Sequence, residues 1–138
     1  MSWADSLIKL STYEVETLQK RLGEIAGRRM QAEMNLVLLE AEGEAEIEHA
    51  RQDAEAGWYQ LGFLEGLRMR KAQARIEIDR IAAEEAGARD VLAQAFEEQK
   101  KYELVAENIR LARNKEIARQ ETAALDELGL RRVAVGGR

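Results

Sequence analysis

A row of apolar residues repeats every 3.5 residues between residues 8 and 50, and this row most constrains the fold. Steps of three and four residues reach nine apolar residues in 13 positions. The positions are Ile8, Ser11, Val15, Leu18, Leu22, Ile25, Arg29, Ala32, Leu36, Leu39, Gly43, Glu46 and Ala50, here called the first seam. This spacing is typical of a helix that packs along a second helix in a coiled coil. The first seam therefore requires a partner helix.

A second seam with the same period follows between residues 64 and 109, and 11 of its 14 positions are apolar. The positions are Leu64, Leu67, Lys71, Ala74, Ile78, Ile81, Glu85, Ala88, Leu92, Ala95, Gln99, Tyr102, Ala106 and Ile109. Between Gln52 and Gly62 the periodicity fades, and two glycines there favour a turn. The second seam can serve as the partner of the first.

We therefore predict one domain, a single helical hairpin over residues 1–138. Its parts are a first arm over about residues 3–54, a turn at about 55–60, a second arm over about 61–127 and a flexible tail at 128–138. Ser2–Asp5 and Ser11–Glu14 both have capping-box spacing, and we favour the earlier start for the first helix. Leu128–Gly129 resembles a helix stop.

The charges select an antiparallel register in which opposed residue numbers add to about 114. Arg29, a basic interruption of the first seam, then faces Glu85, an acidic interruption of the second, and Gly43 faces Lys71. Residues 38–48 hold five glutamates and no basic residue, whereas residues 66–76 hold four basic residues and no acid. Such complementarity sets orientation in coiled coils. We predict an all-α fold, a long antiparallel two-helix coiled-coil hairpin, with Arg29 and Glu85 as its register pair.

The alternative fold is one continuous helix that forms a parallel dimer. It would place residues 38–48 of both chains together, acid against acid, and Arg29 beside Arg29. Charge patterning disfavours this arrangement without excluding it.

Composition argues against an enzyme. The chain has no Cys, which removes thiolate catalysis and thiolate zinc sites, and its one His cannot build a catalytic triad. Glu46-x-x-His49 has the spacing of carboxylate-bridged metal sites, but such a site needs a second motif, so a solvated surface His is the favoured interpretation. We predict no catalytic, cofactor-binding or metal-binding residue. A metal-dependent helical-bundle enzyme remains a rival.

Charge and hydropathy also limit the partners. The net charge of −5 argues against nucleic acid. The longest aliphatic run, Leu36–Leu39, is far too short to span a bilayer, and the N-terminus does not resemble a signal peptide. We predict neither nucleic-acid binding nor direct membrane insertion.

Apolar residues outside the seams form two groups, one near the turn and one near the paired termini. The groups are Val37, Leu38, Trp58, Tyr59, Phe63 and Met69, and Trp3, Leu7, Leu10, Leu104 and Leu111. Two such groups indicate docking surfaces or self-association, and both readings stay open. Gly23-x-x-x-Gly27 and Gly62-x-x-x-Gly66 are compatible with the close approach of another helix.

Several segments resemble a known family. Residues 13–24, Tyr-Glu-Val-Glu-Thr-Leu-Gln-Lys-Arg-Leu-Gly-Glu, resemble the opening of FliJ-type flagellar export proteins through their Glu-Val-Glu and Leu-Gly-Glu elements. Gln31–Leu36, Phe63–Leu67 and Leu125–Leu128 fit later segments of that family. The resemblance extends over nearly the whole chain.

The resemblance implies a function and a location. FliJ-like hairpins are similar to the central-stalk coiled coil of rotary ATPases and belong to the bacterial flagellar type III protein export apparatus. The implied protein is a non-enzymatic coupling rod that docks in the hexameric export ATPase and reaches the cytoplasmic domain of the export gate. The family is also linked to export chaperones. The implied location is cytoplasmic, peripheral at the inner face of the cell membrane through the export apparatus.

The resemblance also implies two sets of contact residues. The ATPase-docking candidates are Leu7, Leu10, Tyr13, Arg110, Arg113 and Arg119. The export-gate-facing candidates are Leu39, Phe63 and Leu67. Family members carry aromatic residues where this chain has Glu42 and Glu46, which is a departure from the family pattern near the implied gate contact. The alternative function is a generic coiled-coil scaffold or dimerisation module.

Overall fold

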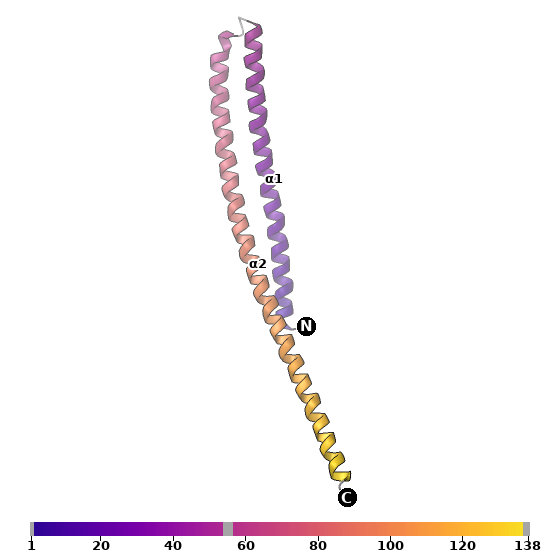
Figure 1. The fold of residues 1–138 in the computed structure, drawn as a ribbon. Coiled ribbons are helices and arrows are strands. Elements are labelled where there is room, and N and C mark those ends of the chain that lie inside the picture. Colours follow the sequence, from indigo (N-terminus) through magenta and orange to yellow (C-terminus); the bar gives the residue numbers. More distant parts are fainter. Residues whose placement is uncertain (1, 54–56, 137–138) are drawn as a thin grey trace. The chain divides into compact units, whose positions relative to one another are not determined.

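The structure is a computed structural model that describes residues 2–53 and 57–136, with the backbone alone for residues 57 and 58. It contains the helices α1 (Trp3–Gln52) and α2 (Gly57–Gly136), and the described residues form no strand (Figure 1). The two long helices pack against each other. The predicted all-α hairpin is therefore confirmed.

A capping box starts α1 at its earlier predicted position. The Ser2 backbone N–H and hydroxyl both donate to Asp5 Oδ2 at 3.0 Å, and the Asp5 N–H donates to Ser2 Oγ at 3.3 Å. These bonds satisfy donors at the helix start that have no partner within the helix. Ser11 lies inside α1, where its hydroxyl donates to the Ile8 carbonyl.

The helix boundaries differ from the sequence analysis at two places. Of the predicted turn, residues 55–56 lie outside the described residues, and residues 57–60 already belong to α2. The helix stop predicted at Leu128–Gly129 is wrong, since α2 continues to Gly136. Gly129 has no positive φ, and the Glu127–Arg131 ion pair of 3.0 Å spans it. An exposed helical glycine costs only about 1 kcal/mol, so it does not end a helix by itself.

The chain divides into two compact units, and each contains a stretch of both helices. Unit 1 consists of described residues 2–13 and 95–136, and unit 2 consists of residues 14–94 apart from 54–56. In unit 2, α1 and α2 run antiparallel, because Arg28 pairs with Glu84 while Glu42, further along α1, pairs with Arg70. The core of unit 2 includes Ile25, Ala32 and Ile81, with Ile78 and Ala88 packed against them.

Both predicted seams form the contact between the helices. Every position of each seam is buried or half-buried. Gly43 packs against Leu67, the most deeply buried large side chain at 1% exposure. A β-carbon at position 43 would lie 2.6 Å from Leu67 Cδ2, so a side chain there would collide with the leucine. The lack of a side chain at Gly43 therefore leaves room for Leu67. Lys71, which was predicted to face Gly43, also comes near, since its Nζ lies 3.8 Å from the same β-carbon position.

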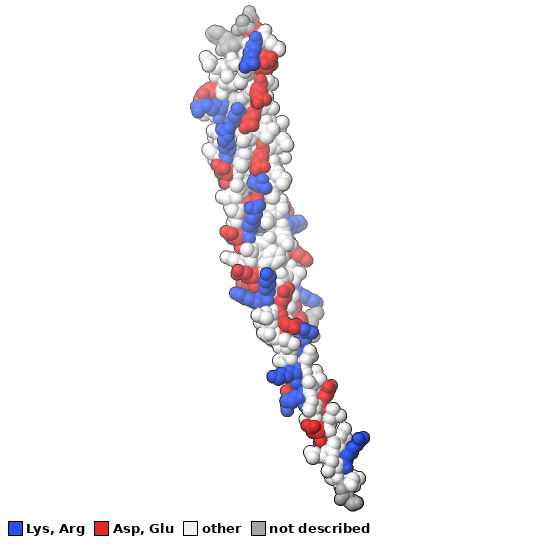
Figure 2. Space-filling view, in the orientation of Figure 1, with Lys and Arg blue, Asp and Glu red and all other residues white. Residues whose placement is uncertain are grey.

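The charge pattern across the seams also appears in unit 2. In the upper part of Figure 2, acidic side chains of α1 lie beside basic side chains of α2. Arg70 and Glu42 make one of these contacts at 3.8 Å. The opposed charge blocks of the sequence thus face each other.

In unit 1, the first turns of α1 pack against the middle of α2, and α2 residues 110–136 have no described helix beside them. Gln99 Nε2 donates to Thr12 Oγ1 at 2.9 Å, and Ala4 and Ala95 are buried. From Arg110 to Gly136 every described residue is exposed. Figure 1 accordingly shows the C-terminal part of α2, coloured orange to yellow, without a neighbouring helix.

Candidate interaction surfaces

The register pair is in contact within unit 2. Arg29 Nε lies 2.5 Å from Glu85 Oε2, and the carboxylate of Glu85 is buried. A second arginine, Arg89, holds Glu85 Oε1 from the following turn of α2. The hydrogen bond from Arg29 lowers the pKa of Glu85 despite the opposing effect of burial. Arg29 and Glu85 are thus in contact, as the sequence predicts. Their role in fixing the register stays a prediction.

A neighbouring ion pair was missed by the sequence analysis. Arg28 binds Glu84 with two parallel N–H to oxygen bonds of 3.0 Å, and this contact lowers the pKa of Glu84. Such two-pronged geometry is the most specific form of an arginine–carboxylate pair. The signal was available, because Arg28 and Glu84 immediately precede the two residues predicted to pair.

The predicted ATPase-docking residues all belong to unit 1. Leu10 and Tyr13 are 65% and 70% exposed, whereas Leu7 is half-buried. Arg110 pairs with Glu107 and Arg119 with Glu116, one turn earlier on α2 in both cases. Arg113 makes no such pair with any described residue.

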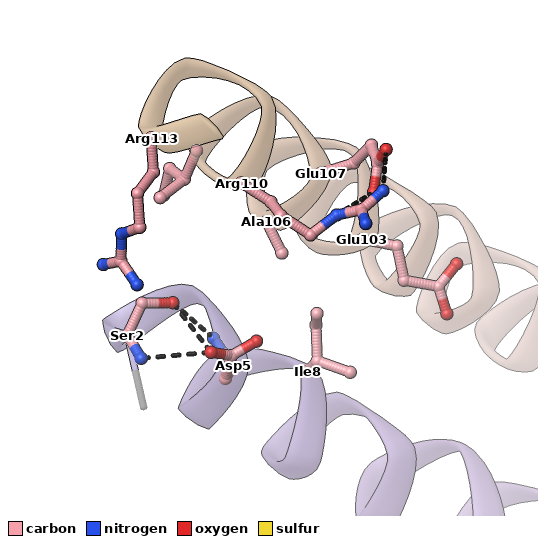
Figure 3. A pocket seen from close by; sticks show the side chains of 9 residues that line it. Ser2, Asp5, Ile8, Glu103, Ala106, Glu107, Arg110 and Arg113 are labelled. Carbon is pink, nitrogen blue, oxygen red and sulfur yellow. Dashed lines mark hydrogen bonds and ion pairs between the residues drawn. The ribbon is translucent and has the colours of Figure 1, made fainter. Parts of the chain in front are cut away.

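A hollow of about 410 Å³ lies between the start of α1 and α2 in unit 1. Ile8 and Ala106 line its apolar part, while Asp5, Arg110 and Arg113 line its polar part. Figure 3 shows Arg113 extended toward Ser2 and Arg110 held to Glu107. The pKa of Asp5 is lowered, first by the hydrogen bond from the Ser2 backbone and also by the charge of Arg113. The structure thus brings Arg110 and Arg113 together with the N-terminus of α1, but not Leu10, Tyr13 or Arg119, which do not line this hollow.

The predicted gate-facing residues lie in unit 2 with unequal exposure. Leu39 and Phe63 are half-buried. The guanidinium of Arg70 lies 6.0 Å from the Phe63 ring centroid, within the range of a cation–π contact. Leu67 fills the gap at Gly43 and offers no surface to a partner in this structure.

A family model described as the flagellar FliJ protein matches residues 5–138. The chain belongs to the FliJ family. Flagellar FliJ proteins from two strains of Caulobacter vibrioides, NA1000 / CB15N and ATCC 19089 / CIP 103742 / CB 15, are similar to it. Each is 54% identical over 136 residues, which cover 99% of this chain and 98% of the relative. No solved structure matches the chain.

Membership of the FliJ family confirms the resemblance carried by Tyr13–Glu24 and the later segments. His49 is exposed, and the described residues hold no group of three or more His, Cys, Asp or Glu arranged to bind a metal ion. Among the described residues of this FliJ-family chain, neither α1 nor α2 contains an apolar segment that is long enough to cross a bilayer.

Proposed function

We propose that this chain is a non-enzymatic component of the bacterial flagellar type III protein export apparatus. One observation carries the proposal: the FliJ family match over residues 5–138, together with relatives named flagellar FliJ protein at 54% identity. The two-helix fold supports a mechanical rather than a catalytic role. It presents long surfaces, and its buried carboxylate, Glu85, is paired with Arg29 across the contact between the helices.

Unit 1 docks in the ring of the export ATPase. Leu10 and Tyr13 supply exposed apolar contacts. Arg113 supplies a cation that lies beside the start of α1, where its charge also lowers the pKa of Asp5. Residues 111–136 add a helix that has no packing partner within the described chain. A helix that binds one conformation of a ring better than another shifts the ring toward that conformation, which is how a stalk biases an ATPase.

Unit 2 contacts the cytoplasmic domain of the export gate through Leu39 and Phe63. Leu67 supports this surface from beneath, because its side chain packs at Gly43. Attachment to ATPase and gate places the protein at the inner face of the cell membrane, where it also meets export chaperones.

The test is the hydrolysis rate of the cognate export ATPase, with this protein at less than one copy per hexamer. We expect stimulation by the wild-type chain and its loss in Leu10→Glu and in Arg113→Glu. Leu61→Glu and Arg75→Glu are the matched controls, because both residues are exposed but belong to unit 2. No stimulation, with no co-migration on a sizing column, would favour the generic coiled-coil scaffold.

A further inference from the structure

A second row of residues runs along the face of α1 that points away from α2. It repeats every 3.5 residues, like the first seam, and none of its members belongs to that seam. Its members are Lys20, Gly23, Gly27, Met30, Met34, Val37, Ala41 and Glu44, here called the outer row. All of them are exposed, and Met30, Met34 and Val37 are 60%, 53% and 54% exposed.

The outer row has the properties of a helix-packing surface. Between its charged ends it contains no charged residue over two dozen positions of chain. No atom lies within 4 Å of a β-carbon built at Gly23 or Gly27, so a neighbouring backbone can approach there. Coiled-coil periodicity without a partner helix in the same chain indicates a partner helix from elsewhere.

We propose that the occupant of the outer row is the outer row of a second copy of this chain, in antiparallel orientation. Opposed residue numbers then add to 64. Met30 lies opposite Met34, Gly27 opposite Val37, and Gly23 opposite Ala41. Each large apolar side chain meets another or a glycine, as interdigitated helix packing requires.

Charge complementarity sets the orientation and the length of this contact. The antiparallel register places Lys20 of one copy opposite Glu44 of the other, at both ends of a two-fold symmetric interface. Lys20 and Glu44 carry this complementarity, because Arg28, Arg29 and Glu42 are already paired across the α1–α2 contact of unit 2. A parallel pair would instead oppose Lys20 to Lys20 and Glu44 to Glu44. The next antiparallel pair would be Glu16 with Glu48, two like charges, and the interface therefore ends at Lys20 and Glu44.

The dimer goes beyond the proposed export function and uses other residues. The outer row lies in unit 2, apart from the ATPase-docking residues of unit 1, and it excludes Leu39 and Phe63. One helix face of each copy makes an interface at the small end of the specific range, which starts at roughly 1,200 Å². The dimer is therefore weak and depends on protein concentration.

Sedimentation of the full chain over a concentration series tests the proposal. We expect the weight-average mass to rise from 15.6 kDa toward twice that value as concentration increases. Met34→Glu should hold the mass at one chain, because a carboxylate would be buried against Met30 of the other copy. Met69→Glu is the matched control, since Met69 is an exposed methionine of unit 2 on α2, and it should leave the rise intact. Helix content measured by circular dichroism should be equal in both variants.

Cysteine cross-linking tests the orientation, because the natural chain has no Cys. A mixture of Gly23→Cys and Ala41→Cys chains should form a disulfide-linked pair, and neither variant alone should link to itself. A mass of one chain at every concentration would overturn the proposal. So would an equal effect of Met34→Glu and Met69→Glu, or self-linking of Ala41→Cys. ATPase stimulation is read separately, so failure of the dimer leaves the export function untouched.

Discussion

Arg29 and Glu85, the central polar interruptions of the two seams, meet in the structure with Nε and Oε2 2.5 Å apart. Because Glu85 is buried, removing its partner leaves a carboxylate without its main compensating charge. We expect Arg29→Glu to lower the melting temperature by several degrees and to reduce helicity at 37 °C, as followed by circular dichroism.

The charge-reversed double variant, Arg29→Glu with Glu85→Arg, should recover part of the lost melting temperature. Recovery is partial because Glu33 and Arg89, which now contact the pair, would each meet a like charge. A double variant that melts no higher than the single variant would mean that this contact does not fix the register.

Replacing an exposed helical glycine with alanine usually stabilises a protein, but at Gly43 the same replacement should destabilise unit 2. Gly66→Ala, at an open position, should stabilise unit 2 by about 0.5–1 kcal/mol through helix propensity. Gly43→Ala should instead destabilise it by about 1–3 kcal/mol, because its β-carbon would press on the enclosed Leu67 side chain. Urea unfolding of the two variants gives both values, and a gain in stability for Gly43→Ala would show that Leu67 can move aside.

Stability should fall in acid because carboxylates are paired in the folded chain. Hydrogen bonds from Arg28 and Arg29 lower the pKa values of Glu84 and Glu85. A group whose pKa is lower in the folded state stabilises it above its unfolded pKa and loses that contribution as pH falls through the folded value. We therefore expect the melting temperature to be level near neutral pH and to drop below about pH 5.

The pH dependence has its own control. Glu84→Gln with Glu85→Gln removes both titrating groups, so this variant should melt lower at pH 7 and show a shallower fall in acid. A fall as steep as that of the wild-type chain would assign the acid sensitivity to other carboxylates, including Asp5, whose pKa is also lowered.

Removal of the chain after Arg110 should separate stability from function. Every described residue beyond that point is exposed, and of these residues only Arg113 lines the hollow beside α1, so the melting temperature of the remainder should change by less than about 2 °C. Stimulation of the export ATPase should disappear, because the partnerless part of α2 is gone. Full stimulation by the shortened chain would restrict docking to the remaining residues of unit 1.

The contact between the helices could be predicted because its pattern repeats. Both seams follow one period, and the interruptions at Arg29 and Glu85 carry opposite charges, which leaves a single favourable register. At Gly43 the same logic gave only part of the contact, because Leu67, one helical turn before the predicted Lys71, comes closer to the glycine than Lys71 does. A side chain in a helix pair enters the gap between facing residues, so Leu67 occupies the space that simple opposition assigned to Lys71.

The ends of the helices and the roles of surface residues could not be predicted from the sequence as well as the contact between the helices. Glycine is a common residue at the end of a helix. Whether α2 ends at Gly129, however, depends on backbone hydrogen bonds and on side-chain pairs such as Glu127–Arg131. For Leu67, the sequence supports both a seam position and a gate-facing one. Only its place against Gly43 decides that it is part of the core.

The contacts between α1 and α2 become less local from unit 2 to unit 1, and this sets an order of assembly. Arg29 and Glu85 are 56 residues apart along the chain, whereas Thr12 and Gln99 are 87 apart. The entropy lost on closing a loop rises with its length, so each pair formed nearer the chain reversal lowers the cost of the next. The contacts between α1 and α2 should therefore form in order of loop length, and the contact between Thr12 and Gln99 should form late. Thermal fraying and hydrogen exchange should begin at that end, the end from which α2 continues alone.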